Sequence, residues 1–406
     1  MSFPPIARTD WLRAPEGLTL MPRGSVTTPE GFRAGAVACG LKESGALDVG
    51  VLVSDRPTTS GLVDTANALP AAPVHRNRTL DRTGLRGIVA NAGNANAATG
   101  EQGLRDAIEM GDRAAMGLGI DPGVVVTSST GVIGRLFSMD TLRAGIDGSV
   151  AALSDGGGPD FAAAICTTDR FPKAGAFSIE IAGQRIHLGV ASKGAGMINP
   201  NMATMLCYIT TDASVDAGDL QRATAIAAGK SFNRISVDGQ MSPSDTLVVM
   251  ANGDGPALAG ADLTRFSQAL TTVCRWSAIQ MVKDGEGAEH VVRLDVRGAA
   301  DVAEAERVAR AIGTSPLVKA AIFGRDPNWG RVEQAVGQAL IGAPGEVHEP
   351  LLAFDGLAVD AAGIDQVLAL PEYDLRVDLG RGPGEAEVFA SDLTHAYVSI
   401  NADYTT

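Results

Sequence analysis

Aromatic residues are scarce in this sequence and make up only 4% of its 406 positions, although 45% of the residues are hydrophobic. The core must therefore be built mainly from Ala, Val, Leu and Ile side chains. The 49 glycines allow segments of backbone to approach one another closely. A chain of this length and apolar content can bury one large core or two smaller ones.

Basic residues are also in deficit, because 33 Lys and Arg face 47 Asp and Glu, which gives a net charge of −14. Such a chain repels phosphate backbones, so we expect no nucleic-acid partner. No apolar run reaches the ~18 residues that a membrane span requires. The first residues, Met1 to Pro5, lack the charged-then-apolar order of a signal peptide. We therefore expect a cytoplasmic protein that does not associate with membranes.

Residues that commonly bind metals are few and dispersed, with four cysteines and five histidines in the whole chain. The cysteines form no C-x-x-C pair, and no histidine stands at ligand spacing from another ligand. This pattern argues against both a zinc site and a disulfide framework. We expect no metal, and we expect the histidines to be structural. The cysteines are Cys39, Cys166, Cys207 and Cys274.

The most informative stretch runs from Ser192 to Leu206 and contains two glycines and a proline. Such a loop allows close approach of backbone or ligand, because glycine has no Cβ and accepts positive φ. The apolar run Met205–Ile209 follows and has the length of a buried strand. This order predicts that Thr204 lies at the mouth of the strand, in a position to react.

Several further motifs accompany this loop. One of them, Ser129–Gly134, follows a β-branched run and places a Thr hydroxyl beside a Gly amide at Thr130 and Gly131. Such a donor pair can stabilise a tetrahedral oxyanion. In chain order the motifs are Val26–Ala34, Asn91–Gly100, Ser129–Gly134, Thr167–Asp169, Lys193–Gly196, Ala203–Leu206, Asp284–Ala288, Ser315–Ala321, Gly324–Arg331 and Asn401–Thr406.

From about residue 25 to residue 406, these motifs resemble the ornithine acetyltransferase family, also called glutamate N-acetyltransferases. The resemblance implies an α/β fold of layered mixed β-sheets with flanking helices. It also implies that the precursor cuts itself between Ala203 and Thr204. Residues 1–203 would then form an α chain and residues 204–406 a β chain, together making one catalytic body.

The resemblance assigns a role to each matching residue. Thr204 is the nucleophile, and Thr130 and Gly131 form the oxyanion hole. The expected substrate-binding residues are Thr167, Lys193, Thr204, Glu286, Asn401 and Thr406. The chemistry is consistent with these roles, because a threonine hydroxyl needs an adjacent base and an N-terminal threonine supplies one in its own amine. That amine titrates at about 7.7 to 8.0 in model compounds.

The implied reaction is transfer of acetyl from N2-acetyl-L-ornithine to L-glutamate in arginine biosynthesis. It would proceed through an acetyl ester on Thr204, with Lys193 facing the substrate carboxylate and Glu286 facing the ammonium group. No metal or organic cofactor is expected. Acetyl-CoA is a co-substrate only if the enzyme also makes N-acetylglutamate directly. The family's habit further implies a heterotetramer of two α and two β chains.

Three places depart from the family pattern. Gly61–Leu69 replaces a Phe-Thr-Thr-Asn-x-Val-Lys pattern, Cys166 stands in place of Met, and Ser242–Asp245 replaces Ser-Thr-Asn-Asp. None of these changes removes a predicted catalytic residue. The first loses a lysine and therefore bears on how the acyl acceptor is held.

Two other functional classes stay open at this point. An N-terminal-nucleophile amidohydrolase or aminopeptidase would pass the acyl group to water and release acetate without glutamate. A non-catalytic binding protein on the same scaffold would remain a single uncut polypeptide of about 41.6 kDa. Its behaviour would not change on Thr204→Ala.

The sequence also predicts individual elements. Alternating apolar residues indicate a hairpin over 177–190, and helical spacing indicates helices over 104–118 and 302–312. Thr99 and Gln102 are typical of a capping box at the start of the first helix. The segment Asp326–Gly330 is expected to be a turn that a buried tryptophan holds in place.

Overall fold

The computed structural model describes residues 5–199 and 205–403. Its centre is a six-stranded mixed sheet, here called the central sheet, in the order β1-β7-β8-β9-β11-β4. The strands are β1 (Thr19–Met21), β7 (Lys173–Ile181), β8 (Gln184–Lys193), β9 (Leu206–Thr211), β11 (Thr246–Ala251) and β4 (Thr59–Asp64). β8 and β9 are antiparallel, and Lys193 pairs with Leu206.

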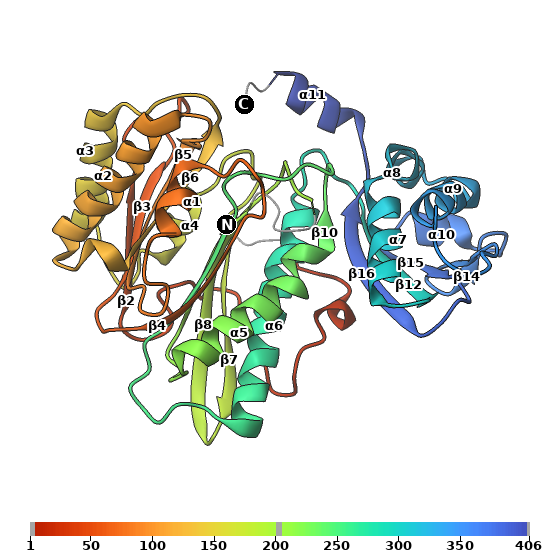
Figure 1. Ribbon diagram of the computed structural model, residues 1–406, viewed down its shortest axis with the longest axis horizontal. Coiled ribbons are helices and arrows are strands. Elements are labelled where there is room, and N and C mark those ends of the chain that lie inside the picture. The colour runs from red at the N-terminus through yellow and green to blue at the C-terminus, as the bar shows by residue number, and fades with distance from the viewer. Residues whose placement is uncertain (1–4, 200–204, 404–406) are drawn as a thin grey trace.

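The side chains of the central sheet alternate between two cores, as the period of a strand requires. In β9, Leu206 and Tyr208 face one core, whereas Cys207 and Ile209 face the other. The second core is closed by α5 (Ala217–Gly229) and α6 (Gly260–Lys283). These helices cover the lower part of the sheet in Figure 1.

A four-stranded sheet, here called the outer sheet, packs on the other face of the central sheet. Its order is β2 (Phe32–Val37), β3 (Val49–Ser54), β5 (Gly87–Asn94) and β6 (Val125–Val132). The helices around it are α1 (Ala72–Asn77), α2 (Gly100–Leu118), α3 (Met139–Ala151) and α4 (Gly158–Ala164). α2 and α3 cover its far face (Figure 1), so helices enclose two stacked sheets.

The rest of the chain builds a third, C-terminal sheet in the order β10-β16-β12-β15-β13-β14. The strands are β10 (Ile235–Ser236), β16 (Gly384–Ser391), β12 (Val291–Ala299), β15 (Glu372–Asp378), β13 (Leu351–Phe354) and β14 (Leu357–Ala358). The helices are α7 (Val302–Thr314), α8 (Pro316–Phe323), α9 (Trp329–Ala339), α10 (Ile364–Leu368) and α11 (His395–Asp403). α11 leaves this sheet and extends towards the outer sheet (Figure 1).

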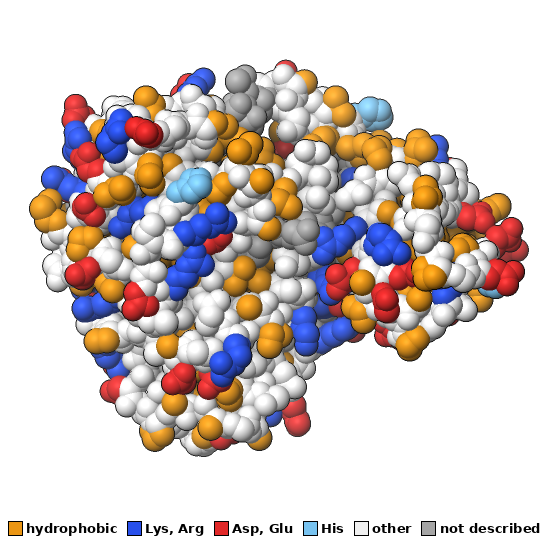
Figure 2. Space-filling model, viewed as in Figure 1, with side chains coloured by type: hydrophobic (Ala, Val, Ile, Leu, Met, Phe, Trp, Pro, Cys, Tyr) orange, Lys and Arg blue, Asp and Glu red, His pale blue; other side chains and the backbone are white. Residues whose placement is uncertain are grey.

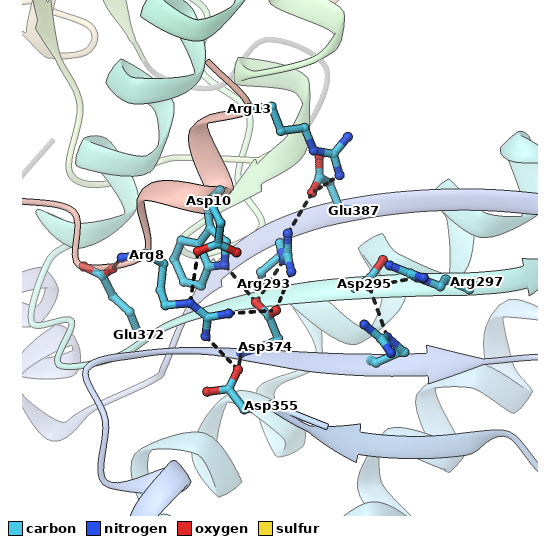
Figure 3. A network of polar contacts seen from close by, with 12 residues as sticks. Arg8, Asp10, Arg13, Arg293, Asp295, Arg297, Asp355, Glu372, Asp374 and Glu387 are labelled. Atoms are coloured by element: carbon cyan, nitrogen blue, oxygen red, sulfur yellow. Dashed lines mark hydrogen bonds and ion pairs between the residues drawn. The ribbon is translucent and has the colours of Figure 1, made fainter. Parts of the chain in front are cut away.

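The first described residues run onto the C-terminal sheet, far away in sequence. Arg8, just before the 3-10 helix η1 (Thr9–Leu12), lies 2.7 Å from Asp355 and 3.2 Å from Asp374. Figure 3 shows this network of ion pairs between the segment and the sheet. Trp11 is fully buried, and its ring centroid lies 5.2 Å from that of Phe389. Two further 3-10 helices are η2 (Pro122–Val124) and η3 (Phe232–Arg234).

The expected fold class is confirmed, as are the hairpin over 177–190 and the helices that contain 104–118 and 302–312. Two local predictions are wrong. Thr99 precedes α2 but makes no cap to the helix backbone, because its hydroxyl donates to Asn96 instead. Trp329 is 54% exposed and begins α9, which Asn328 caps through the Arg331 amide.

Within the described residues, no helix combines the length and apolar character needed to cross a membrane. On the face shown in Figure 2, Lys and Arg side chains lie among Asp and Glu side chains and do not form one continuous basic surface.

Candidate active site

A cavity opens where the central and outer sheets meet the end of the chain. Six of the predicted site residues line it together, although they come from five separate stretches of sequence. They are Thr130, Gly131, Thr167, Lys193, Glu286 and Asn401. The cavity wall also includes Ala95, Ile133, Thr168, Gly196, Met197, Ser242, Pro243 and Ser244.

The predicted oxyanion pair lies at the end of β6, where Thr130 is 4% exposed. β6 runs parallel to β5, and Gly131 pairs with Gly93. Gly131 has a φ of 129°, and a Cβ at this position would lie 2.4 Å from the Gly93 carbonyl carbon. Only glycine fits this close approach, which brings the Gly131 backbone to the cavity wall.

Lys193 ends β8 and points its ammonium group at two hydroxyls. Its Nζ lies 2.8 Å from Thr167 Oγ1 and 3.4 Å from Thr130 Oγ1. The residue is only 2% exposed. The cation therefore lies directly beside the predicted oxyanion hole, where it can stabilise developing negative charge as well as a substrate carboxylate.

Asp169 holds Thr167 and Lys193 in place. Its carboxylate accepts hydrogen bonds from the Thr167 amide at 2.9 Å and the Gly194 amide at 2.8 Å. Its Oδ2 also lies 3.9 Å from Lys193 Nζ. Burial alone would raise the pKa of Asp169, but the nearby ammonium groups of Lys173 and Lys193 hold it below its usual range. The carboxylate is thus ionised and fixes both ends of the Lys193–Thr167 contact.

Lys173 completes a buried charge cluster behind the cavity. Its Nζ lies 2.6 Å from Asp169 and 2.5 Å from Asp284, and all three side chains are inaccessible to solvent. Burial would lower the pKa of Lys173, but the two carboxylates raise it above its ordinary value. Burial raises the pKa of Asp284, and Lys173 offsets part of that rise. With Lys193 included, the cluster contains two ammonium groups and two carboxylates, and the Arg170 guanidinium also lies 3.2 Å from Asp284.

Glu286 and Asn401 face each other in the cavity wall. Asn401 Nδ2, on α11, donates to Glu286 Oε2 at 2.8 Å, and the Glu286 amide donates to the Ala195 carbonyl at 2.9 Å. Gly196 packs directly against this carboxylate, because a Cβ there would lie 2.5 Å from its atoms. The loop after β8 and the C-terminal helix therefore meet at Glu286.

Two acidic residues hold the chain on either side of residues 200–204. Asp238 accepts the amides of Met197 at 2.6 Å and Ile198 at 2.9 Å. Asp245 accepts the Met205 amide at 2.9 Å. The predicted cleavage site Ala203 and Thr204, and the predicted ligand Thr406, lie outside the described residues. Thr204 is nevertheless bonded to Met205, which is next to the partner of Lys193 in the sheet.

The sequence reasoning did not find the residues that support the site. Asp169, Lys173 and Asp284 each carry a charge within two to six residues of a predicted ligand. That proximity is a signal in retrospect, but the pairing of Lys173 with Asp284 joins residues 111 positions apart. No group of three His, Cys, Asp or Glu side chains that could hold a metal occurs within residues 5–199 and 205–403.

The chain is similar to known proteins over most of its length. A family model described as the ArgJ family matches residues 33–406. The arginine biosynthesis bifunctional protein ArgJ of Symbiobacterium thermophilum is 45% identical over 399 residues, covering 94% of this chain and 99% of that protein. The corresponding protein of Deinococcus radiodurans is 44% identical over 393 residues, covering 95% and 99%.

A similar solved structure is ornithine acetyltransferase from Mycobacterium tuberculosis, complexed with ornithine. It is 34% identical to this chain and has a TM-score of 0.43. The match covers 47% of this chain and all of that chain.

Proposed function

Because the chain belongs to the ArgJ family, we propose that it transfers acetyl from N2-acetyl-L-ornithine to L-glutamate through an acetyl ester on Thr204. It is an acyltransferase of arginine biosynthesis. The observation that carries the proposal is the single cavity lined by all six predicted site residues that fall in the described part of the chain.

The proposed mechanism begins with self-cleavage between Ala203 and Thr204, which frees the amine of Thr204. That amine takes the hydroxyl proton as Thr204 Oγ attacks the acetyl carbonyl. The Thr130 hydroxyl and the Gly131 amide receive the oxyanion, and Lys193, 3.4 Å from Thr130 Oγ1, adds positive charge beside them. Ornithine leaves, glutamate enters, and the ester passes its acetyl group to the glutamate amine.

Substrate selection follows from charge. Lys193 and Thr167 offer donors for the α-carboxylate that both amino acids carry. Glu286, with Asn401 beside it, offers an acceptor for the side-chain ammonium that only acetylornithine carries. Glutamate has no ammonium at that end, so ornithine and glutamate can exchange at one site. We propose that Thr406 also contributes to binding, as the family motif implies.

The two proposed chains would be tightly interleaved. β8 from the first half pairs with β9 from the second, and β4 from the first half pairs with β11 from the second. This interleaving supports one catalytic body made of residues 1–203 and 204–406. A heterotetramer of two such pairs and a cytoplasmic location are further parts of the proposal.

Acetyl-CoA is proposed as a second acetyl donor, because the similar proteins are named bifunctional. Release of free CoA that depends on glutamate would support this activity. Absence of release while acetylornithine still reacts would restrict the enzyme to recycling acetyl groups.

The test combines intact-mass analysis with an acetyl-transfer assay. We expect two chains of 203 residues each, with a new N-terminus at Thr204, and a single uncut chain for Thr204→Ala. Acetyl from labelled acetylornithine should appear on glutamate. Label appearing as acetate whether or not glutamate is present would favour the hydrolase alternative instead.

A further inference from the structure

A second cavity, here called the apolar groove, adjoins the active-site cavity. It is formed by the segment before α1, by α1 itself, by the first half of α2 and by the loop before β11. Three residues, Ile133, Met197 and Pro243, line both cavities. All three are apolar, so the two cavities meet at an apolar border.

Large apolar side chains are exposed in this groove. Leu69 is 82% exposed, Leu104 38% and Ile108 43%, and all three line the groove. Leu104 and Ile108 stand one helical turn apart on α2 and therefore share a face. A single exposed apolar residue needs no explanation, but several that line one groove mark a binding surface. The surface suits an apolar ligand, because burial removes apolar area from water.

Hydrogen bonds hold the backbone at the border between the two cavities. The Ala71 amide donates to the Pro243 carbonyl at 2.9 Å. The Gly134 amide donates to the Ala97 carbonyl at 2.9 Å, which fixes the chain next to Ile133. The methionine at the border has an unbranched thioether side chain, which can change rotamer and let a flexible chain pass.

The proposed binding mode directs the acyl group towards this border. The acetyl oxygen is received by Thr130 and Gly131, while Lys193 and Glu286 bind the charged groups of the amino acid. The carbon chain of the acyl group is apolar, so it favours the apolar part of the wall over these charged groups. Ile133 belongs to that part and stands two residues after Gly131. The inference rests on the proposed function, because it concerns the acyl group that the same reaction transfers.

The two cavities differ greatly in volume. The active-site cavity measures about 70 Å³, whereas the apolar groove measures about 950 Å³. An acetyl group ends in one methyl group and can remain in the smaller cavity. A longer unbranched chain needs more room, which the groove provides beyond the shared border.

Two of the three departures from the family pattern lie on the groove. Pro243 belongs to Ser242–Asp245 and stands where the pattern has a threonine, and Leu69 ends Gly61–Leu69, which lacks the lysine of the pattern. Both departures make the groove less polar. Transfer of acetyl does not account for either of them, whereas binding of an apolar chain accounts for both.

We propose that the enzyme also transfers unbranched acyl groups longer than acetyl, from N2-acyl-L-ornithine to L-glutamate, and that the apolar groove binds the acyl chain. The chemistry is the one proposed for acetyl and passes through the same ester. The acyl carbonyl carbon exchanges its bond to the ornithine nitrogen for a bond to the glutamate nitrogen. The proton that the glutamate amine gives up replaces the acyl group on ornithine, so the exchange needs no further reactant.

Donors that differ only in chain length test the activity. N2-acetyl-, N2-butyryl- and N2-hexanoyl-L-ornithine are each supplied with glutamate, and mass spectrometry follows the N-acylglutamate formed. We expect kcat/KM for the hexanoyl donor to exceed that for the butyryl donor by up to about fourfold per added methylene, because each one is buried. Transfer of acetyl alone would overturn this proposal and leave acetyl transfer standing. Transfer of none of the three groups would overturn the proposed function, and this proposal with it.

Two variants test whether the groove binds the chain. Leu104→Gln and Ile108→Gln place polar groups in the groove without touching the active-site cavity. We expect acetyl transfer to be unchanged, and kcat/KM for the hexanoyl donor to fall about fourfold or more. Met116→Gln is the matched control, because Met116 lies on the same helix, is 66% exposed and stands outside the groove.

Equal hexanoyl transfer in the two groove variants and in the control would overturn the role of the groove. A second copy of the chain is the other occupant that these variants detect by gel filtration. A lower molecular mass for Leu104→Gln and Ile108→Gln, with the same preference for chain length as the wild type, would assign the groove to an interface and overturn the proposal.

Discussion

Asn401 Nδ2 and Glu286 Oε2 lie 2.8 Å apart, so a residue five positions before Thr406 contacts a carboxylate that is 115 positions earlier in the sequence. Both residues line the cavity that Lys193 also lines, and Asn401 reaches it from α11. The contact leaves Glu286 Oε1 able to accept a hydrogen bond from a substrate cation.

We expect Glu286→Gln to raise the KM for acetylornithine by about tenfold to a hundredfold, because a hydrogen bond to a charged group contributes about 1.5–3 kcal/mol. The rate at saturating acetylornithine should change much less, since in the proposed binding mode Glu286 faces the end of the substrate remote from the acetyl group. The exposed Glu289 is the control, and Glu289→Gln should leave the KM as it is. An unaltered KM in Glu286→Gln would remove this residue from the site.

Gly196→Ala should displace the same carboxylate without touching its charge. The added Cβ would lie 2.5 Å from the Glu286 carboxylate atoms, so the flexible side chain must move out of its present position. We expect a raised KM for acetylornithine with nearly unchanged stability, measured by steady-state kinetics and urea unfolding. Gly229→Ala provides the control, because a Cβ there meets no atom within 4 Å. Equal KM values in the two variants would show that Glu286 is not held by Gly196.

The residues that line the cavity could largely be predicted from sequence, because each stands in a short motif that resembles the ornithine acetyltransferase family. Thr130, Lys193 and Glu286 were predicted to share a site on that basis, and the structure brings them to one cavity. The close backbone packing at the site could not be predicted. The close approach of Gly131 to Gly93 depends on the register of two parallel strands, which no local pattern encodes.

Long-range pairing explains why the charged residues that support the site were not predicted. The Lys173–Asp284 ion pair joins residues 111 positions apart, and a lone lysine or aspartate in a sequence gives no sign of its partner. The prediction of a buried Trp329 is wrong for a different, local reason. Tryptophan is usually buried, but here the Asn328 cap starts a helix at that point and leaves the ring exposed.

Lys173→Met should be strongly destabilising, because it leaves Asp169 and Asp284 buried without their shared cation. Loss of one partner from a buried ion pair costs about 3–5 kcal/mol, which urea unfolding would measure. The half-exposed Arg170, also bound to Asp284, is the control, and Arg170→Gln should cost less than about 1 kcal/mol. Adding Asp284→Asn to Lys173→Met should recover part of the loss. Equal free energies of unfolding for Lys173→Met and Arg170→Gln would show that the buried charge cluster does not stabilise the fold around the site.

Lys319 should make stability depend on pH in the alkaline range. Its Nζ donates a hydrogen bond to Ser391 Oγ at 3.2 Å. Burial of the side chain lowers the pKa of Lys319 to about 8. The unfolded chain has an ordinary lysine pKa of about 10.4 and thus binds more protons between those values. The free energy of unfolding of the wild type, minus that of Lys319→Met, should therefore rise by roughly 1–3 kcal/mol between about pH 8 and about pH 10. Lys230→Met, at an exposed lysine, should give no such trend, and a flat difference for Lys319→Met would contradict the assignment.

Trp11 should hold the two proposed chains together, because it belongs to residues 1–203 and packs on a sheet built from residues 204–406. Its indole Nε1 donates to Asp374 at 2.8 Å, and its buried ring lies beside Phe389. Truncation of a buried tryptophan costs about 3–5 kcal/mol. We therefore expect the cut chains of Trp11→Ala to separate at a lower urea concentration than those of the wild type, measured by gel filtration of the cleaved protein.

Arg33→Ala is the control, because Arg33 pairs on the surface with Asp55 of the same chain and should change stability by less than about 1 kcal/mol. Separation of the Trp11→Ala and wild-type chains at the same urea concentration would mean that the paired strands β8 and β9 hold the chains together without help from the N-terminal segment.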